Sequence, residues 1–166
     1  TMSVGKTTLV NELAKLPEFK DYTSRTERSK HLMDLGIPLN MDSTLKGQLV
    51  FAAERASELL CDKILTDRTV IDVMAFCELS SSMTANEAFY LNSALGHLVD
   101  DYDHLFYVSP VGVKIEDNGV RETDVKYRDE INKKILSILD LRDIKYTTIQ
   151  GITEERIKLV KSVIFS

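Results

Sequence analysis

Several stretches of the chain carry apolar residues at intervals of three to four positions, the spacing of one face of an α-helix. The first stretch begins at Gly5 or Lys6 and reaches about Lys15. Further helices are predicted over residues 44–61, 70–79 and 84–99, from 123 or 124 onward, and from 153 onward. The residues expected to cap them are Ser43 or Thr44, Thr84 with Glu87 in a capping box, and Thr153. The residues expected to face inward from the helix after 123 are Ile131, Ile135, Ile138 and Leu139.

Short runs of apolar, β-branched and aromatic residues lie between these helices. They predict strands over residues 19–23, 63–67, 104–109 and 145–149. Helices and strands therefore alternate, which favours an α/β fold. Because the chain contains no internal repeat and no Pro/Gly/Ser-rich linker, residues 1–166 are predicted to form a single domain.

The most specific chemical motif opens the chain and leads directly into the first predicted helix. It consists of Ser3, Val4, Gly5, Lys6, Thr7 and Thr8. In such a loop, successive backbone N–H groups point inward and the helix N-terminus adds a partial positive charge, so the loop can hold a phosphate. Lys6 can neutralise the β- and γ-phosphates of a nucleotide, and Thr7 can ligate Mg²⁺ through its hydroxyl. The competing interpretation is a polar turn that only caps a helix.

One element of the full motif, G-x-x-x-x-G-K-[ST], lies outside the sequence. Its first glycine would precede Thr1 by one residue, and the strand that feeds the loop would lie before that glycine. A parallel sheet without this central strand would leave a large hydrophobic gap. We therefore expect the natural chain to continue upstream of Thr1, and an intact mass of 18.8 kDa would contradict this expectation.

A second chemical pattern stands at the C-terminal end of the strand predicted over 63–67. In open α/β sheets, ligands bind beyond the carboxyl ends of the strands. Asp67 at this position can deprotonate an acceptor hydroxyl or hold the water shell of a metal ion, and Arg68 can neutralise phosphate. The competing interpretation is a surface salt bridge at a strand end. Asp72, one helical turn later, either orients Arg68 or caps the next helix.

Three segments together resemble a known family. GKTTL, DRTVID and the late segment DNGVRETD are similar to the small P-loop kinases. The nearest groups are the ribosylnicotinamide-kinase-like domains and the phage nucleotide or DNA-base kinases, including 5-hydroxymethyluridine DNA kinases. The resemblance spans nearly the whole chain. It implies a P-loop NTPase three-layer sandwich with a parallel sheet of strand order 2-3-1-4-5, its first strand lying before Thr1, and ATP·Mg²⁺ as the phosphate donor.

The same resemblance assigns roles to the second acid and to a lid. Asp67 matches the acid that follows the third strand, and Arg121 falls in a lid segment at about 112–128. Arginines that close over the γ-phosphate are expected in phosphoryl transfer, and Arg128, seven positions after Arg121, is the second candidate. The competing interpretation of both arginines is a solvated, charged helix start.

Candidate acceptor-binding residues lie earlier in the chain. Arg25 and Arg28 follow the strand predicted over 19–23, and similar arginines in nucleotide kinases bind an acceptor phosphate. The amide of Gln48 can read the edge of a base, while Phe51 and Phe76 can stack on a ring. The competing interpretations are an exposed basic turn for the two arginines, and core or surface positions for the other three residues.

Charge and composition narrow the class of partner. Lys and Arg number 21 against 26 acidic residues, a net charge of −5, which weakens the case for a generally basic nucleic-acid surface. Neither the two cysteines nor the three histidines show metal-ligand spacing, so no zinc site is predicted. No apolar run approaches the roughly 18 residues of a membrane span, and no signal peptide opens the sequence. We expect a cytoplasmic protein, in the host cytoplasm if it is viral.

The predicted function is ATP-dependent transfer of the γ-phosphate to a hydroxyl group. The acceptor is a nucleoside, a nucleotide or a hydroxymethylated base in DNA, and the residues do not decide among these. Two alternatives stay open at this stage. One is an NTPase switch or assembly factor without a small-molecule acceptor, and the other is a phosphate-binding module without catalysis.

Overall fold

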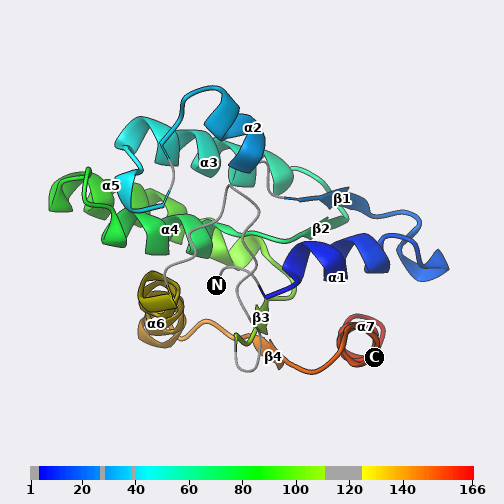
Figure 1. Cartoon of the computed structure of the whole chain (residues 1–166). Helices are drawn as coiled ribbons and strands as arrows, with labels where there is room; N and C mark the ends of the chain where they lie inside the picture. The colour runs from blue at the N-terminus through cyan, green and yellow to red at the C-terminus, as the bar shows by residue number, and fades with distance from the viewer. Residues whose placement is uncertain (1–3, 27–28, 39, 111–124) are drawn as a thin grey trace.

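The computed structural model describes residues 4–26, 29–38, 40–110 and 125–166, in which helices and strands alternate (Figure 1). The helices are α1 (Lys6–Leu13), α2 (Ser29–Asp34), α3 (Leu45–Glu58), α4 (Val70–Leu79), α5 (Ala85–Gly96), α6 (Val125–Leu141) and α7 (Thr153–Ile164). The strands are β1 (Thr23–Arg25), β2 (Ile64–Thr66), β3 (Phe106–Val108) and β4 (Thr147–Ile149). Short 3₁₀ turns cover Pro17–Phe19, Asn40–Asp42 and Val99–Asp101. The predicted α/β class is confirmed.

Local capping chemistry sets the starts of the central helices. The Thr44 hydroxyl accepts a hydrogen bond from the Gly47 amide at 3.3 Å and caps α3. At the start of α5, the Glu87 carboxylate accepts from the Thr84 amide at 2.7 Å, and the Thr84 hydroxyl accepts from the Glu87 amide at 3.2 Å. Both predicted caps are confirmed. Each satisfies backbone donors that the first turn of a helix leaves without an intrahelical partner.

All strand pairs of the described chain are parallel. β1 pairs with β2 in the register Thr23 to Ile64 and Arg25 to Thr66. β3 pairs with β4 in the register Phe106 to Thr147. Since parallel neighbours need a crossover, helices must connect each strand to the next one in the sheet. The carboxyl ends of β1 and β2 consequently lie side by side, so the residues that follow these two strands meet at one edge.

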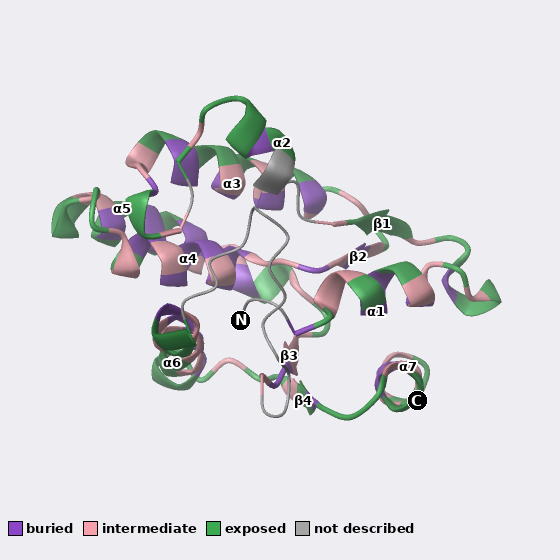
Figure 2. Ribbon diagram, viewed as in Figure 1, coloured by how far each residue is buried: buried purple, intermediate pink, exposed green. Residues whose placement is uncertain are grey.

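Two hydrophobic clusters hold the helices and strands together (Figure 2). One gathers residues of α4, α5 and α6, including the predicted inward-facing side chains of α6, all of which are buried. The other joins α1 and α7 to β2, β3 and β4. Phe106 and Val108 of β3 pack in the second cluster, whereas Tyr107 between them packs against the first. Because successive side chains of a strand point to opposite faces, helices cover both faces of β3.

A cavity separates the two strand pairs. Its volume is about 300 Å³, and its walls include β2, β3, apolar residues of α1, α6 and α7, and the charged residues Lys6, Asp67 and Asp72. Among the described residues, no backbone hydrogen bond joins β2 to β3. The facing edges of these two strands therefore border the cavity. No helix within the described ranges is long and apolar enough to cross a membrane.

Two expectations about element boundaries are wrong. The strand expected over 19–23 lies at Thr23–Arg25, because Pro17 starts a 3₁₀ turn that buries Phe19, with 1% of its surface exposed, against Tyr22. Thr153 does not cap the last helix: it is the first residue of α7, after Ile152. The Ile152 amide donates instead to the Glu155 carboxylate at 3.0 Å, since the isoleucine side chain has no acceptor.

Candidate functional site

The opening motif forms a tight turn at the N-terminus of α1. Gly5 precedes the helix with φ 79°, in the left-handed region that glycine adopts without steric cost. Val4 is buried, and Lys6 begins the helix. Ser3 lies outside the described residues. The first amides of α1 have no intrahelical acceptor, so this end of the helix carries donors and partial positive charge suited to an anion.

Thr7 of α1 and Asp67, which follows β2, contact each other directly. The Thr7 hydroxyl donates a hydrogen bond to Asp67 Oδ2. Asp67 is 5% exposed, so its carboxylate lies at the base of the site rather than on the surface. The structure thus brings together two residues that the sequence proposed for one metal site. A hydroxyl and a carboxylate are both hard oxygen ligands, which suit Mg²⁺.

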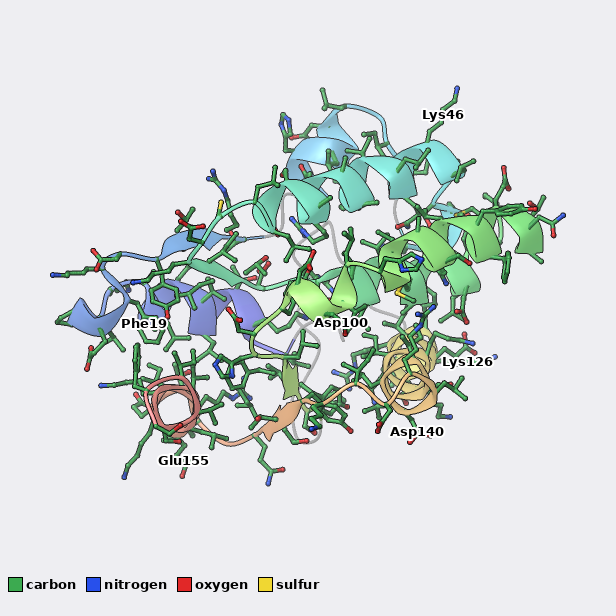
Figure 3. All side chains as sticks on the ribbon, turned by 180° about the vertical axis from the view of Figure 1, so that it is seen from behind. Phe19, Lys46, Asp100, Lys126, Asp140 and Glu155 are labelled. Atoms are coloured by element: carbon green, nitrogen blue, oxygen red, sulfur yellow. The ribbon has the colours of Figure 1, made fainter. Side chains whose placement is uncertain are left out.

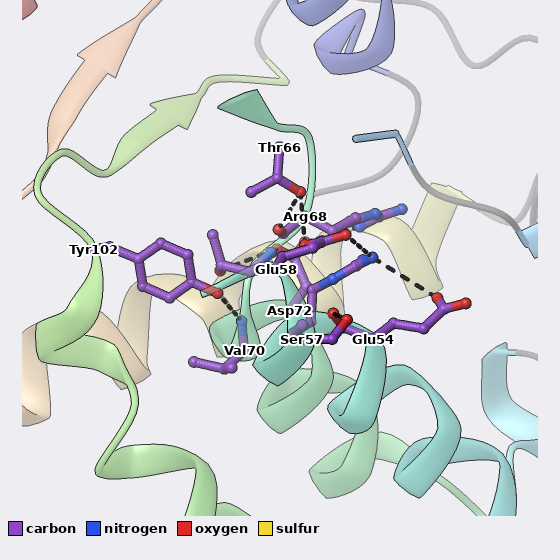
Figure 4. A network of polar contacts seen from close by, with 10 residues as sticks. Glu54, Ser57, Glu58, Thr66, Arg68, Val70, Asp72 and Tyr102 are labelled. Atoms are coloured by element: carbon purple, nitrogen blue, oxygen red, sulfur yellow. Dashed lines mark hydrogen bonds and ion pairs between the residues drawn. The ribbon is translucent and has the colours of Figure 1, made fainter. Parts of the chain in front are cut away.

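Arg68 is held by an ion pair and by an aromatic ring. Its Nη1 lies 2.8 Å from Asp72 Oδ1, and its guanidinium lies over the Phe76 ring, 5.7 Å from the centroid. The other oxygen of Asp72 accepts from the Thr69 amide at 3.0 Å and caps α4. Asp72 therefore does both things that the sequence left open: it orients Arg68 and it caps the helix (Figure 4).

The charge balance at Asp72 follows from this arrangement. Burial alone would raise the pKa of the Asp72 carboxyl, but that pKa lies well below its usual range, and the charge of Arg68 makes the largest contribution to lowering it. Asp72 is consequently ionised at every physiological pH. It keeps Arg68 at the carboxyl end of β2, directly after Asp67.

A buried charge network lies on the inner face of α3, where the sequence predicted a largely apolar stripe. That prediction is wrong in part. The buried residues are Gly47, Gln48, Ala52, Arg55 and Glu58, whereas Leu49 and Leu60 are 48% and 86% exposed. Arg55 Nη2 lies 2.6 Å from Glu58 Oε1, and Glu58 Oε2 accepts from the Thr66 hydroxyl at 3.1 Å. The network thus joins α3 to the last residue of β2 (Figure 4).

Burial shifts the pKa values of Glu58, which belongs to this network, and of Tyr102 nearby. Burial raises the pKa of Glu58, and the charge of Arg55 with the hydrogen bonds from Arg55 and Thr66 only partly offsets it. The Tyr102 hydroxyl accepts from the Val70 amide at 3.2 Å, and burial raises the pKa of this phenol far above its usual value. Sequence reasoning missed Arg55, Glu58 and Tyr102. The helical spacing of Arg55 and Glu58 gave no signal of burial, because a charged pair at this spacing is typical of an exposed face.

Some of the remaining predicted site residues lie within the described structure, and others lie outside it. Arg25 ends β1, is exposed, and pairs in register with Thr66, so it lies at the same sheet edge as Asp67. Gln48 is 3% exposed on α3. Arg28 and Arg121 lie outside the described residues, as does most of the expected lid at 112–128. Arg128 belongs to the first turn of α6, and Phe76 contacts Arg68 rather than an open surface.

Within the described residues, no cluster of three or more His, Cys, Asp or Glu side chains has the arrangement of a metal centre. Any metal at this site would therefore rest on few protein ligands, with Thr7 and Asp67 the pair in place. This sparse coordination is the way Mg²⁺ is usually bound beside a nucleotide, since the ion keeps several waters and phosphate oxygens.

Comparison with known proteins places this geometry in context. A family model described as an AAA domain matches residues 1–156. Two solved structures of the deoxyadenosine kinase of M. mycoides are similar in fold, one with bound dCTP and one with the product dCMP and a flexible dCDP. The first has 16% sequence identity, a TM-score of 0.61, and covers 99% of this chain and 95% of its own. The second has 14% identity, the same TM-score, and covers 99% and 93%. No curated protein matches the sequence.

These likenesses show the fold. The chain has a P-loop NTPase architecture of the nucleoside-kinase-like kind, with α/β content and parallel strands. The turn at Gly5 and the contact between Thr7 and Asp67 lie at the carboxyl end of β2, the edge at which open α/β sheets bind ligands.

Proposed function

Because the chain belongs to the AAA domain family of P-loop proteins, we propose that it is an ATP-dependent kinase that phosphorylates a hydroxyl of a nucleoside-type acceptor. The observation that carries this proposal is the hydrogen bond from Thr7 to Asp67, which joins the phosphate loop to the carboxyl edge of β2. The similarity in fold to deoxyadenosine kinase supports the same reading.

We also propose that the fold is a three-layer sandwich whose parallel sheet has the strand order 2-3-1-4-5. In this sheet, β1 with β2 would form one side and β3 with β4 the other. The cavity between β2 and β3 would hold the central strand. Two features support it: both facing strand edges border the cavity, and the side chains of β3 alternate between helical clusters on its two faces. A single domain over 1–166, with a lid at about 112–128, is the arrangement we propose.

On the donor side, the loop residues would bind the polyphosphate of ATP. The amides of Val4, Gly5 and Lys6, with those of Thr7 and Thr8, would donate to phosphate oxygens, and Ser3 would extend the loop. The Lys6 ammonium would neutralise the β- and γ-phosphates. Mg²⁺ supplies further charge neutralisation when bound, and Thr7 and Asp67 are the residues that would hold it.

In the transfer step, the acceptor hydroxyl oxygen forms a bond to the γ-phosphorus while the bond from that phosphorus to the β–γ bridging oxygen breaks. ADP leaves with the electron pair of that bond, and the hydroxyl proton passes to a base. Asp67 is our candidate for this base, and it is also one of the two residues proposed to hold Mg²⁺. Its position at 5% exposure, beside Arg68 and Thr7, supports a role in the reaction centre.

On the acceptor side, we propose Arg25, Arg28, Gln48 and Arg68 as binding residues. Arg25 ends β1, Arg68 follows the adjacent strand β2, and Asp72 fixes Arg68 in place. Gln48 is 3% exposed on α3, and its side-chain amide would pair with polar atoms of the acceptor. Arg121 and Arg128 are proposed as lid residues that shield the transferred charge.

The net charge of −5 favours a free nucleoside or nucleotide over a base within DNA. The test offers labelled ATP with deoxyadenosine, deoxycytidine, their monophosphates, and duplex DNA that carries hydroxymethylated pyrimidines. Labelled product from a nucleoside, with a rate that varies little between low and moderate salt, is the expected result. ATP turnover that no acceptor stimulates would contradict the proposal. Steep loss of activity with salt on the DNA substrate would move the acceptor to DNA.

A further inference from the structure

Arg156 of α7 contacts the backbone of the phosphate loop. Its Nη1 donates a hydrogen bond to the carbonyl of Val4 at 2.6 Å, across a separation of 152 positions in the chain. Its Nε donates to the carbonyl of Gly151 at 2.8 Å. The residue is 9% exposed, and its bond to the Val4 carbonyl is buried. α7, which carries the labelled Glu155, packs against α1 at this point (Figure 3).

The contact with the loop is close enough to fix its shape. A Cβ atom placed on Gly5 would lie 3.3 Å from Arg156 Nη1, tighter than most contacts of real side chains. Gly5 also has φ 79°, a conformation that other residues adopt at a cost. The guanidinium and the glycine therefore fit each other, and the planar donor fork of arginine reaches two carbonyls at once.

This hydrogen bond sets the direction of one peptide unit. No peptide bond in the described chain is cis, so the carbonyl of Val4 and the amide of Gly5 point in opposite directions. Because Arg156 draws the Val4 carbonyl toward α7, the Gly5 N–H is directed away from α7. This is the amide that starts the row of donors at the N-terminus of α1.

We propose that Arg156 is a positioning residue for phosphate binding. It holds the Val4–Gly5 peptide so that the Gly5 amide donates to the bound polyphosphate, and it ties the phosphate loop to the turn at Gly151. This role rests on the ATP binding proposed above. The guanidinium also adds a positive charge behind the anion site.

The sequence contains a hint of this role. Arg156 follows Glu154 and Glu155 at the start of α7, where acidic residues favour the helix dipole and a cation opposes it. A cation at this end of a helix needs a partner outside the helix. The two carbonyls supply that partner.

The test compares Arg156→Lys and Arg156→Gln with the wild-type protein. The matched control is Lys158→Gln, which removes one exposed charge two positions away on α7. ATP and inorganic tripolyphosphate are titrated by calorimetry, and the Gly5 amide proton is followed by NMR during both titrations. Thermal unfolding of the ligand-free proteins gives the structural baseline.

In the wild-type protein and the Lys158 control, the Gly5 amide proton should shift downfield with either ligand. In Arg156→Gln this shift should be lost, with the Kd for both ligands raised by about 10- to 100-fold, the range expected for one charge-assisted hydrogen bond. Arg156→Lys, which keeps the charge but loses the fork, should fall between. If Arg156→Gln does not fold, Arg156→Lys decides the question.

An unchanged Gly5 shift and unchanged Kd values in the folded variants would overturn the role of Arg156 while leaving the proposed function intact. Lower thermal stability with an unchanged Kd and shift would do the same, since it would assign Arg156 to packing alone. Failure of the wild-type protein to bind ATP would overturn the proposed function, and this inference with it.

Discussion

The hydroxyl of Thr7 donates to the carboxylate of Asp67 across a sequence separation of 60 positions. Thr7 lies in the first turn of α1, and Asp67 follows the last residue of β2. The hydrogen bond therefore joins the first turn of α1 to the strand edge where ligands of parallel sheets bind. A hydroxyl and a carboxylate in contact form a compact oxygen pair that a divalent cation can use.

Asp72 should stabilise the fold at neutral pH and lose this effect in acid. Asp72→Asn weakens both the ion pair with Arg68 and the cap at Thr69, and we expect a loss of about 2–4 kcal/mol in the free energy of unfolding at pH 7. The pKa of Asp72 is lowered in the fold, so its contribution is complete above the unfolded value of about 3.9. It is lost as the pH falls through the folded value.

Chemical denaturation of the wild-type and Asp72→Asn proteins between pH 7 and pH 2 measures this effect. The difference between the two curves should be constant down to about pH 4 and shrink below it. A difference that stays constant to pH 2, or one that grows in acid, would show that the charge of Asp72 does not stabilise the fold at the start of α4.

Arg55 should compensate the buried charge of Glu58. Arg55→Met leaves that carboxylate without its ion pair, and we expect the free energy of unfolding to fall by about 3–5 kcal/mol. The pKa of Glu58 is already raised by burial, so in this variant protonation relieves the cost. The variant should therefore gain stability relative to the wild-type protein as the pH falls from 7 toward 4.

The double variant Arg55→Met/Glu58→Leu provides the control, because it removes both charges and keeps apolar volume on α3. Its stability should recover most of the loss seen in the single variant. If the single and double variants were equally unstable at pH 7, packing of the arginine stem rather than charge would explain the loss.

A substitution of Gln48 should weaken acceptor binding without lowering the stability of the fold. Gln48→Leu replaces a buried amide with an apolar side chain, so the free energy of unfolding should stay the same or rise. The KM for the acceptor should rise by about tenfold, the value of one lost hydrogen bond, while the KM for ATP stays unchanged. Lys46→Leu on the exposed face of α3 is the control, since its side chain points into solvent (Figure 3). Equal acceptor KM values in both variants would remove Gln48 from the acceptor site.

Local chemistry made part of this structure predictable. The starts of α3 and α5 follow from capping residues next to apolar runs, and Asp67 was expected to face the opening turn because ligand sites lie at the carboxyl ends of parallel strands. These inferences need only a few neighbouring residues or a general rule of sheets. They were confirmed for that reason.

Long-range pairing was not predictable in the same way. Nothing local marks Arg55 and Glu58 as buried, because a charged pair at helical spacing is typical of an exposed face. Arg156 is marked locally only as a cation in the acidic first turn of α7, and its partner, the Val4 carbonyl, lies 152 positions away. Phe19 lies in a run with strand propensity, yet a 3₁₀ turn buries its ring better than a strand would.

The most direct test of the account measures how Mg²⁺ changes the affinity for ATP. Calorimetry gives the Kd for ATP with and without Mg²⁺ in the wild-type protein, Thr7→Val, Asp67→Asn and the conservative control Thr7→Ser. We predict that Mg²⁺ tightens ATP binding by about tenfold or more in the wild-type protein and in Thr7→Ser, and that Thr7→Val and Asp67→Asn lose most of this gain while metal-free binding is kept. The same gain from Mg²⁺ in all four proteins would contradict the account.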